Sequence, residues 1–200
     1  MCGRFVGFRS LDELKTFFPI DKVACEATSS FNVAPSQEIL AIIKQAGENW
    51  LDKFHWGLVP FWAKNISIGN KMINARSESV AEKPSFRNAF KKRRCLILAD
   101  GFYEWKGEKG KKQPMFITLP DKNPFAFAGL WERWHKGEGG PLDTCTIITT
   151  TPNGFDWLYD FFEAEPARNP FLHNKRRYFV AKTKDNADNL PPEYLEMLSE

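Results

Sequence analysis

Three features are missing from this sequence: closely paired cysteines, long apolar runs and a large net charge. The cysteines, Cys2, Cys25, Cys95 and Cys145, lie far apart, which disfavours a zinc ribbon and a disulfide scaffold. No run approaches the ~18 apolar residues that a membrane helix needs, and the N-terminus does not resemble a signal peptide. We therefore expect an intracellular, soluble protein with no membrane contact, no metal and no cofactor, whose Cys25, Cys95 and Cys145 are structural.

The net charge of +3 is too small to identify a nucleic-acid-binding protein, so any such prediction depends on where the basic residues cluster. The composition, 42% hydrophobic and 14% aromatic, indicates a folded globule and argues against disorder. The chain has 200 residues, no internal repeat and no clear linker. These features predict a single domain over residues 1–200.

The pattern of apolar residues predicts one early helix followed mainly by strands. Ser10 and Glu13 have the spacing of a capping box, and Pro19 would end the helix. We expect a loop over 21–30, a turn-rich segment over 31–37 and a hairpin turn at 47–49. Strands are predicted at 39–44, 50–56, 95–99, 115–119, 125–134 and 145–150. The predicted fold is α+β, a mainly antiparallel, barrel-like sheet with flanking helices.

The chain begins Met-Cys-Gly-Arg-Phe, which places a thiol at position 2. Removal of Met1 would leave Cys2 with a free α-amine beside its thiol. Both groups are partly nucleophilic near neutral pH, because their reference pKa values are about 8 and 8.5. Such a 1,2-aminothiol captures aldehydes as a Schiff base that closes to a thiazolidine. The alternative is that Cys2 is an inert, buried thiol.

Large aromatic residues surround a glycine and a proline in the segment 56–64. Gly57 and Pro60 disrupt regular strand pairing, which favours a loop. One interpretation is an apolar wedge or stacking platform for unstacked bases, with Lys64 available to a phosphate. The other is that Trp56 and Trp62 fill the end of a barrel.

Two further segments carry polar residues with open interpretations. Asn74 can donate and accept hydrogen bonds, and Arg76 can bind a phosphate; alternatively, Asn74 caps a turn and Arg76 pairs with Glu78 on the surface. The run 91–94, Lys-Lys-Arg-Arg, is the densest basic cluster. It is either a solvated face or an electrostatic rim for a polyanion.

Glu104 lies between Tyr103 and Trp105 in a predicted strand. Partial desolvation there would raise the pKa of its carboxyl and suit it to general acid–base chemistry. Strand alternation places Glu104 on the face of Phe102, with Tyr103 and Trp105 on the other. A cross-strand ion pair is the alternative role for Glu104.

Seven segments together resemble the SOS response-associated peptidase (SRAP) family. They lie in order at 1–5, 31–37, 56–63, 73–78, 83–87, 100–105 and 127–131 and read MCGRF, FNVAPSQ, WGLVPFWA, INARSE, KPSFR, DGFYEW and FAGLW. The resemblance extends from residue 1 to about residue 154. Its order makes it far more specific than any one segment.

The resemblance implies a SRAP-like fold and a protein that binds single-stranded DNA, or a junction of single- and double-stranded DNA, and crosslinks to abasic sites. Cys2 matches the family nucleophile, Asn74 the residue that orients it, and Glu104 the acid–base carboxylate. We expect a monomer in the cytoplasm that joins the nucleoid when bound to DNA. The candidate DNA-contacting residues are Arg4, Asn32, Pro60, Phe61, Trp62, Lys64, Arg76 and Trp105.

The chain departs from the family pattern after residue 154. The family histidine is expected near Asp160, where none occurs, and His173 comes later in a locally similar segment. Either an insertion has moved the histidine to His173, or the C-terminal portion has diverged and His173 is an ordinary surface residue. We expect only a short terminal helix over 191–200.

Two other function classes remain open. A Met-Cys-Gly start is shared with N-terminal-nucleophile glutamine amidotransferases, in which the cysteine attacks an amide. The other is a non-covalent DNA-damage-binding module whose groove still binds single strands. Survival of the DNA complex under denaturing conditions distinguishes the covalent function from the non-covalent one.

Overall fold

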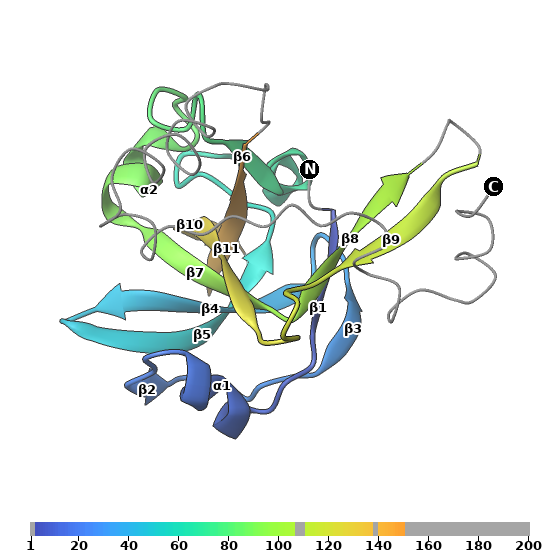
Figure 1. Cartoon of the computed structure of the whole chain (residues 1–200). Coiled ribbons are helices and arrows are strands. Elements are labelled where there is room, and N and C mark those ends of the chain that lie inside the picture. Colours follow the sequence, from blue (N-terminus) through green and yellow to red (C-terminus); the bar gives the residue numbers. More distant parts are fainter. Residues whose placement is uncertain (1–2, 107–110, 138–139, 151–200) are drawn as a thin grey trace, which may run out of the picture. The chain divides into compact units, whose positions relative to one another are not determined.

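Strands are the main regular elements in a computed structural model that describes residues 3–106, 111–137 and 140–150 (Figure 1). The elements are β1 (Arg4–Gly7), α1 (Leu11–Phe17), β2 (Lys22–Val23), β3 (Ser30–Val33), β4 (Glu38–Gln45), β5 (Glu48–Trp56), η1 (Ile66–Lys71), β6 (Asn74–Arg76), α2 (Arg87–Lys92), β7 (Arg94–Ala99), β8 (Gly101–Lys106), β9 (Gln113–Ile117), β10 (Phe125–Gly137) and β11 (Gly140–Thr149). The expected terminal helix at 191–200 lies outside the described residues.

The larger sheet has seven strands in the order β2-β5-β4-β7-β10-β11-β6. An additional pairing of β5 with β11 closes the five neighbouring strands β5, β4, β7, β10 and β11 into a barrel. This closing pair is parallel, with His55 opposite Thr144 and Trp56 opposite Cys145, whereas the other barrel pairs are antiparallel. Closure removes the exposed sheet edges within the barrel. The predicted α+β class and barrel-like, mainly antiparallel sheet are confirmed.

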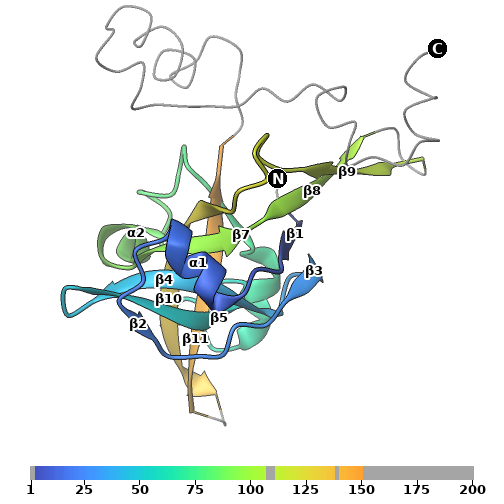
Figure 2. The ribbon, with the colours of Figure 1, turned by 60° about the horizontal axis from the view of Figure 1, so that its bottom comes forward.

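The smaller sheet has the order β3-β1-β8-β9 and packs on the barrel through aromatic side chains. The Phe5 ring meets Trp56 edge-on at 5.1 Å and Phe127 at 6.0 Å. Phe102, opposite Phe5 in the neighbouring strand, contacts Phe127 at 5.7 Å. Phe5 and Trp56 are almost fully buried, so the start of β1 is anchored to the barrel core. Figures 1 and 2 show the β8–β9 hairpin extending beyond the barrel strands.

Helix α1 begins where the capping box predicts. The Ser10 side chain accepts from the Glu13 N–H, and the Glu13 carboxylate accepts from the Ser10 N–H at 2.9 Å. The N–H of Phe18 donates to the Leu14 carbonyl as the helix ends, just before Pro19. Leu14 is buried against Leu98 and its neighbours, so α1 covers one side of the barrel.

Three local predictions were wrong, two of them because tertiary pairing overrode local sequence preference. The expected loop at 21–30 contains β2, which pairs with β5 at an edge without any apolar alternation of its own. The expected turn segment at 31–37 contains most of β3, which pairs with β1. The hairpin turn is at Ala46 and Gly47 rather than 47–49, and both residues have positive φ (51° and 87°), as in a type I′ turn.

Candidate functional site

The N-terminal strand lies directly beside the strand that carries Glu104. In the antiparallel pair of β1 and β8, Arg4 is opposite Tyr103 and Val6 is opposite Gly101. A glycine avoids a clash here, because an added Cβ at Gly101 would lie 2.4 Å from the Phe116 ring. The pairing places the beginning of the described chain next to Glu104. Cys2 lies outside the described residues.

Glu104 is half-buried and lies opposite Met115 in β9. Along β8, Phe102 contacts the barrel core, whereas the Tyr103 ring lies 5.3 Å from Phe116 and its hydroxyl donates to the Phe31 carbonyl. Because side chains alternate along a strand, Glu104 lies on the same face of β8 as Phe102. Trp105 is 42% exposed, so the strand presents a carboxylate and an accessible indole on opposite sides.

Arg4 and Asn32 form a polar pair on the smaller sheet. The Arg4 guanidinium donates to Asn32 Oδ1 at 2.8 Å. Arg4 is half-buried and Asn32 is exposed. A planar guanidinium is the side chain best suited to bind a phosphate.

Asn74 and Arg76 lie on β6, at the edge of the larger sheet. β6 runs parallel to β11, with Asn74 opposite Ile147 and Arg76 opposite Thr149. Asn74 is half-buried and Arg76 is exposed. The residue before Asn74, Ile73, accepts the Trp56 indole N–H through its carbonyl oxygen at 3.0 Å. Because Phe5 also packs on Trp56, one buried indole contacts residues adjacent to both Arg4 and Asn74.

The aromatic segment after β5 divides between core and surface. Trp56 is 1% exposed and belongs to the barrel core, as one interpretation predicted, whereas Trp62 is 44% exposed, contrary to that interpretation. Phe61 is 52% exposed and Pro60 is buried. The loop therefore presents Phe61 and Trp62 outward while Pro60 fixes its base.

Two glycines hold this loop against η1. Gly57 has φ of +137°, and a Cβ there would lie 2.7 Å from the Gly69 carbonyl oxygen. The reverse contact, from a Cβ on Gly69 to the Gly57 oxygen, would be 2.6 Å. Backbone packed this closely on backbone admits only glycine. A hollow of about 330 Å³ lies beside Trp62, and exposed Lys64 and Lys71 help to line it.

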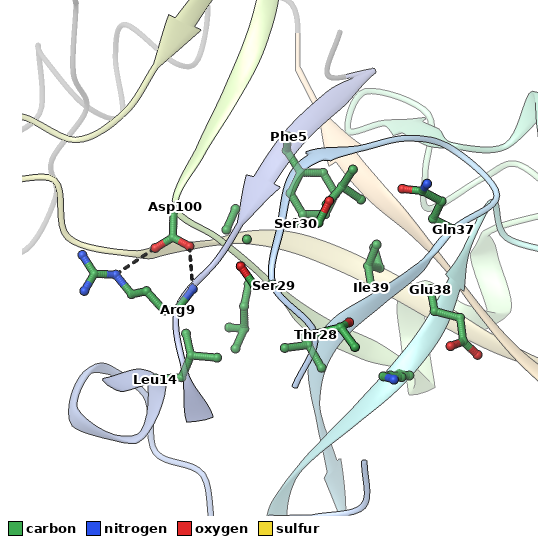
Figure 3. A pocket seen from close by; sticks show the side chains of 16 residues that line it. Phe5, Arg9, Leu14, Thr28, Ser29, Ser30, Gln37, Glu38, Ile39 and Asp100 are labelled. Atoms are coloured by element: carbon green, nitrogen blue, oxygen red, sulfur yellow. Dashed lines mark hydrogen bonds and ion pairs between the residues drawn. The ribbon is translucent and has the colours of Figure 1, made fainter. Parts of the chain in front are cut away.

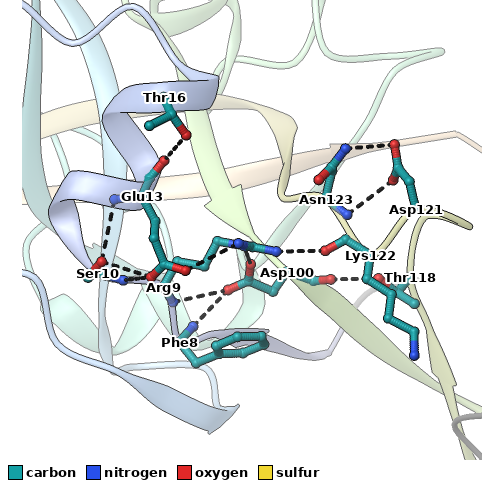
Figure 4. Close-up of polar contacts among 10 residues, drawn as sticks. All are labelled: Phe8, Arg9, Ser10, Glu13, Thr16, Asp100, Thr118, Asp121, Lys122 and Asn123. Carbon is teal, nitrogen blue, oxygen red and sulfur yellow. Dashed lines mark hydrogen bonds and ion pairs between the residues drawn. The ribbon is translucent and has the colours of Figure 1, made fainter.

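Asp100 is a buried charged residue that the sequence analysis did not single out. Its carboxylate accepts from the Phe8 N–H at 2.8 Å and the Arg9 Nε at 2.8 Å (Figure 4). Arg9 also donates to the Lys122 carbonyl and to Glu13. The carboxylate is thus saturated by structural donors, and it ties the end of β1 to the turn before β8. The position of Asp100 immediately after an apolar strand was the available signal.

A cavity of about 230 Å³ lies on this side of β1 (Figure 3). Phe5, Leu14 and Ile39 are among its apolar lining residues, and Ser29, Ser30 and Glu38 are among its polar ones. Of the candidate catalytic and DNA-contacting residues that the structure describes, none lines it. The cavity is therefore separate from the residues that the sequence pattern selected.

The basic run 91–94 is not one uniform face. Lys91, Lys92 and Arg94 are exposed, but the Arg93 guanidinium pairs with the buried Glu132 carboxylate at 2.8 Å. Burial raises the pKa of Glu132, and the charge of Arg93 partly opposes that rise. Arg93 therefore has a structural role in addition to any contribution to a basic surface.

The three other cysteines differ in burial. Cys95 and Cys145 lie in the barrel core, where burial raises the pKa of Cys95 to about 12 and that of Cys145 well above its usual value. Cys25 is half-buried, and desolvation raises its pKa as well. A raised pKa makes these thiols poor nucleophiles at neutral pH.

Within the described ranges there is no group of three histidine, cysteine or acidic side chains arranged to hold a metal ion. A search of the same residues finds no helix long and apolar enough to cross a membrane. His173, like Cys2, lies outside the described part of the chain.

Comparison with known proteins gives the family. The family model described as SOS response associated peptidase (SRAP) matches residues 1–181. The chain belongs to the SRAP family. A Bacillus subtilis relative named abasic site processing protein YoqW is 47% identical over 204 residues, which cover 99% of this chain and 86% of that protein. The Escherichia coli SRAP relative YedK, also named an abasic site processing protein, is 31% identical over 151 residues, or 70% of this chain and 65% of YedK.

Two solved structures share the fold of this chain. A Bacteroides thetaiotaomicron protein has a TM-score of 0.67 at 23% identity, covering 93% of this chain and 85% of that one. A Bordetella bronchiseptica protein has a TM-score of 0.66 at 24% identity, covering 95% and 94%.

Proposed function

We propose that this SRAP protein binds single-stranded DNA, or a single-strand to double-strand junction, and forms a covalent thiazolidine between Cys2 and the aldehyde of an abasic site. The observation that carries the proposal is the pairing of Arg4 with Tyr103. Two residues of chain span at most about 7 Å. In this proposal a nucleophile at position 2 is within reach of the strand that carries Glu104. The names of the relatives supply the class of lesion.

The chemistry requires removal of Met1, either by the chain itself or by an aminopeptidase. The freed amine adds to the aldehyde carbon and forms a carbinolamine. Glu104, acting as an acid, protonates the departing hydroxyl, which leaves as water and gives a Schiff base. The Cys2 thiolate then adds to the imine carbon, and the imine nitrogen takes a proton. The net reaction is a condensation that releases one water.

The remaining candidate residues have positioning or binding roles in this proposal. Asn74 orients the cysteine and the sugar, and Arg4 and Arg76 bind phosphates. Exposed Phe61 and Trp62 stack beside the lesion. His173, if it replaces the family histidine, assists opening of the sugar ring. The protein acts as a monomer in the cytoplasm and on the nucleoid.

The test uses single-stranded DNA with a natural abasic site and a matched strand with a tetrahydrofuran analogue, which has no aldehyde. We expect a denaturation-resistant adduct with the first strand only, and its loss in Cys2→Ala. Intact-mass analysis should find Met1 absent. Borohydride separates the chemical steps because it reduces a Schiff base and leaves a thiazolidine intact. An adduct in the wild-type protein that survives only after borohydride would exclude ring closure by the thiol.

A non-covalent DNA-damage-binding module is the second candidate. The exposed Phe61 and Trp62, with Lys64 beside them, favour it because they suit base stacking without any nucleophile. Equal binding of both strands, with no adduct, is the result expected for this function.

A further inference from the structure

Two aromatic rings stack on the surface at the end of β1. The Phe8 and Phe31 centroids are 5.1 Å apart with planes within 13°. Phe8 is 39% exposed and Phe31 is 66% exposed. The core clusters of the described residues contain neither ring. Burial in the core therefore does not account for this pair, and an exposed aromatic surface is typical of a binding site.

An irregularity in β3 turns Phe31 outward. Phe5 is opposite Val33 and Gly7 is opposite Ser30. Two β3 residues therefore lie opposite one β1 residue, Val6. Those two, Phe31 and Asn32, are both exposed. Strict alternation would have buried one of them. Such β-bulges redirect side chains and occur often beside functional sites.

Phe8 is held in place by contacts that do not depend on a ligand. Its N–H donates to the buried Asp100 carboxylate at 2.8 Å (Figure 4). The Arg9 guanidinium, fixed by the same carboxylate, lies 5.9 Å from the centre of the Phe8 ring, within the range of a cation–π contact. The stack is thus preorganised, which lowers the entropy cost of binding another flat group on it.

The stack adjoins residues that the proposed function assigns to DNA. Asn32, the neighbour of Phe31, accepts a hydrogen bond from Arg4. The Phe31 carbonyl accepts from the hydroxyl of Tyr103, which precedes Glu104. We propose that Phe8 and Phe31 form a base-stacking subsite for an unpaired nucleotide flanking the lesion, with Arg4 on the adjoining phosphate. This inference rests on the proposed function and adds a position on the DNA path.

The shape of the surface favours a nucleobase over a protein side chain. Neither ring lines the neighbouring cavity of about 230 Å³ (Figure 3), and the two near-parallel rings provide a flat apolar surface outside it. Every base has a π face, and stacking on aromatic side chains tolerates any sequence. Duplex bases are already stacked on one another, so the subsite selects unpaired DNA.

The experiment measures non-covalent affinity of the full chain for single-stranded DNA carrying the tetrahydrofuran analogue. Phe31→Ala is expected to weaken binding about 5-fold or more, the effect of losing one stacked base. Phe31→Leu keeps an apolar side chain without the flat face and should show the same loss, whereas Phe31→Tyr should bind as the wild type does. Leu96→Ala is the matched control, because Leu96 is 43% exposed on β7. Its affinity should not change.

A 2-aminopurine scan along the same strand locates the base. At one flanking position the 2-aminopurine fluorescence should be quenched in the wild-type complex and should recover in the complex with Phe31→Ala. The proposed subsite is overturned if Phe31→Ala binds the DNA with wild-type affinity, or if the fluorescence also recovers in the complex with Leu96→Ala. The covalent function is tested separately, because Phe31→Ala should still form adduct with abasic DNA at saturating protein. A wild-type protein that forms no adduct but loses affinity through Phe31→Ala would remove the covalent function and keep the subsite.

Discussion

The indole N–H of Trp56 donates to the carbonyl oxygen of Ile73, the residue before Asn74. This bond fixes the start of β6 to the barrel core, onto which Phe5 also packs. In the proposed function, Asn74 orients the nucleophile. The placement of Asn74 then depends on a tryptophan buried in the barrel core.

Trp56→Phe tests this dependence. The variant keeps an aromatic ring but removes the indole hydrogen bond, leaving the Ile147 N–H as donor to the Ile73 carbonyl, so we expect unfolding to become easier by about 1 kcal/mol. Adduct formation at saturating DNA should also slow. Trp134→Phe is the control, because buried Trp134 makes the same kind of bond to the Ala63 carbonyl. It should lose similar stability in denaturant titrations and keep the wild-type adduct rate. Equal slowing in both variants would contradict the role of Trp56.

Glu104→Gln tests the proposed acid–base step. The amide preserves the shape of the side chain but cannot transfer the proton, so we expect adduct formation to slow by about 100-fold or more. The melting temperature and the affinity for tetrahydrofuran DNA should stay near wild type. Single-turnover gel assays with abasic DNA measure the rate. Exposed Glu82→Gln is the control and should leave it unchanged. A wild-type rate in Glu104→Gln would remove the carboxylate from the mechanism.

The sequence predicted the parts of the fold that local patterns determine. The capping box at Ser10 and the strands β4, β5, β7, β10 and β11 follow from spacing and apolar runs. β2 and β3 were missed because their pairing depends on distant partners.

The same distinction holds for the candidate site. Arg4 was selected by resemblance and Glu104 by its aromatic strand context as well, but only the strand register shows them as near neighbours. Local patterns contain no trace of the Phe8–Phe31 stack, because it depends on a bulge and on a carboxylate far along the chain. Roles for Cys2 and His173 stay predictions.

Gly101→Ala should displace β8 from its place beside β1. The new Cβ would lie 2.4 Å from the Phe116 ring and 3.0 Å from the Ile117 carbonyl oxygen, and overpacking of this kind typically costs about 1–3 kcal/mol. We expect a lower melting temperature and slower adduct formation. Gly7→Ala is the control, because its nearest such contact is 3.9 Å.

A second substitution checks the cause of that loss. If the Phe116 ring is the obstacle, the Gly101→Ala/Phe116→Ala double variant should lose less stability than the sum of the single variants. Additive losses would show that the ring is not responsible.

Asp100→Asn should weaken the anchor of the β1 end. The carboxylate is buried and accepts from the Phe8 N–H and the Arg9 side chain, and removing one partner of a buried charge pair costs about 3–5 kcal/mol. Partial exposure of Arg9 reduces that cost, so we expect about 2–4 kcal/mol in urea titrations. Exposed Asp121→Asn, which loses only local contacts with Asn123, should cost less than about 1 kcal/mol. Similar losses in the two variants would contradict the anchoring role.

His55 should make the fold less stable in mildly acidic solution. Burial lowers the pKa of this half-buried side chain below its ordinary 6.5, and the nearby Glu38 opposes part of that shift. As the pH falls through 6.5, the unfolded chain binds the proton before the folded one does, so the free energy of unfolding decreases. The His55→Gln variant lacks this titration. As the pH is lowered from 7.5 to 5, the free energy of unfolding of the wild type should therefore decrease relative to that of the variant. Exposed His135→Gln is the control, and denaturant titrations across this range measure both differences. If the stability difference between wild type and His55→Gln does not change with pH, folding does not shift the titration of His55.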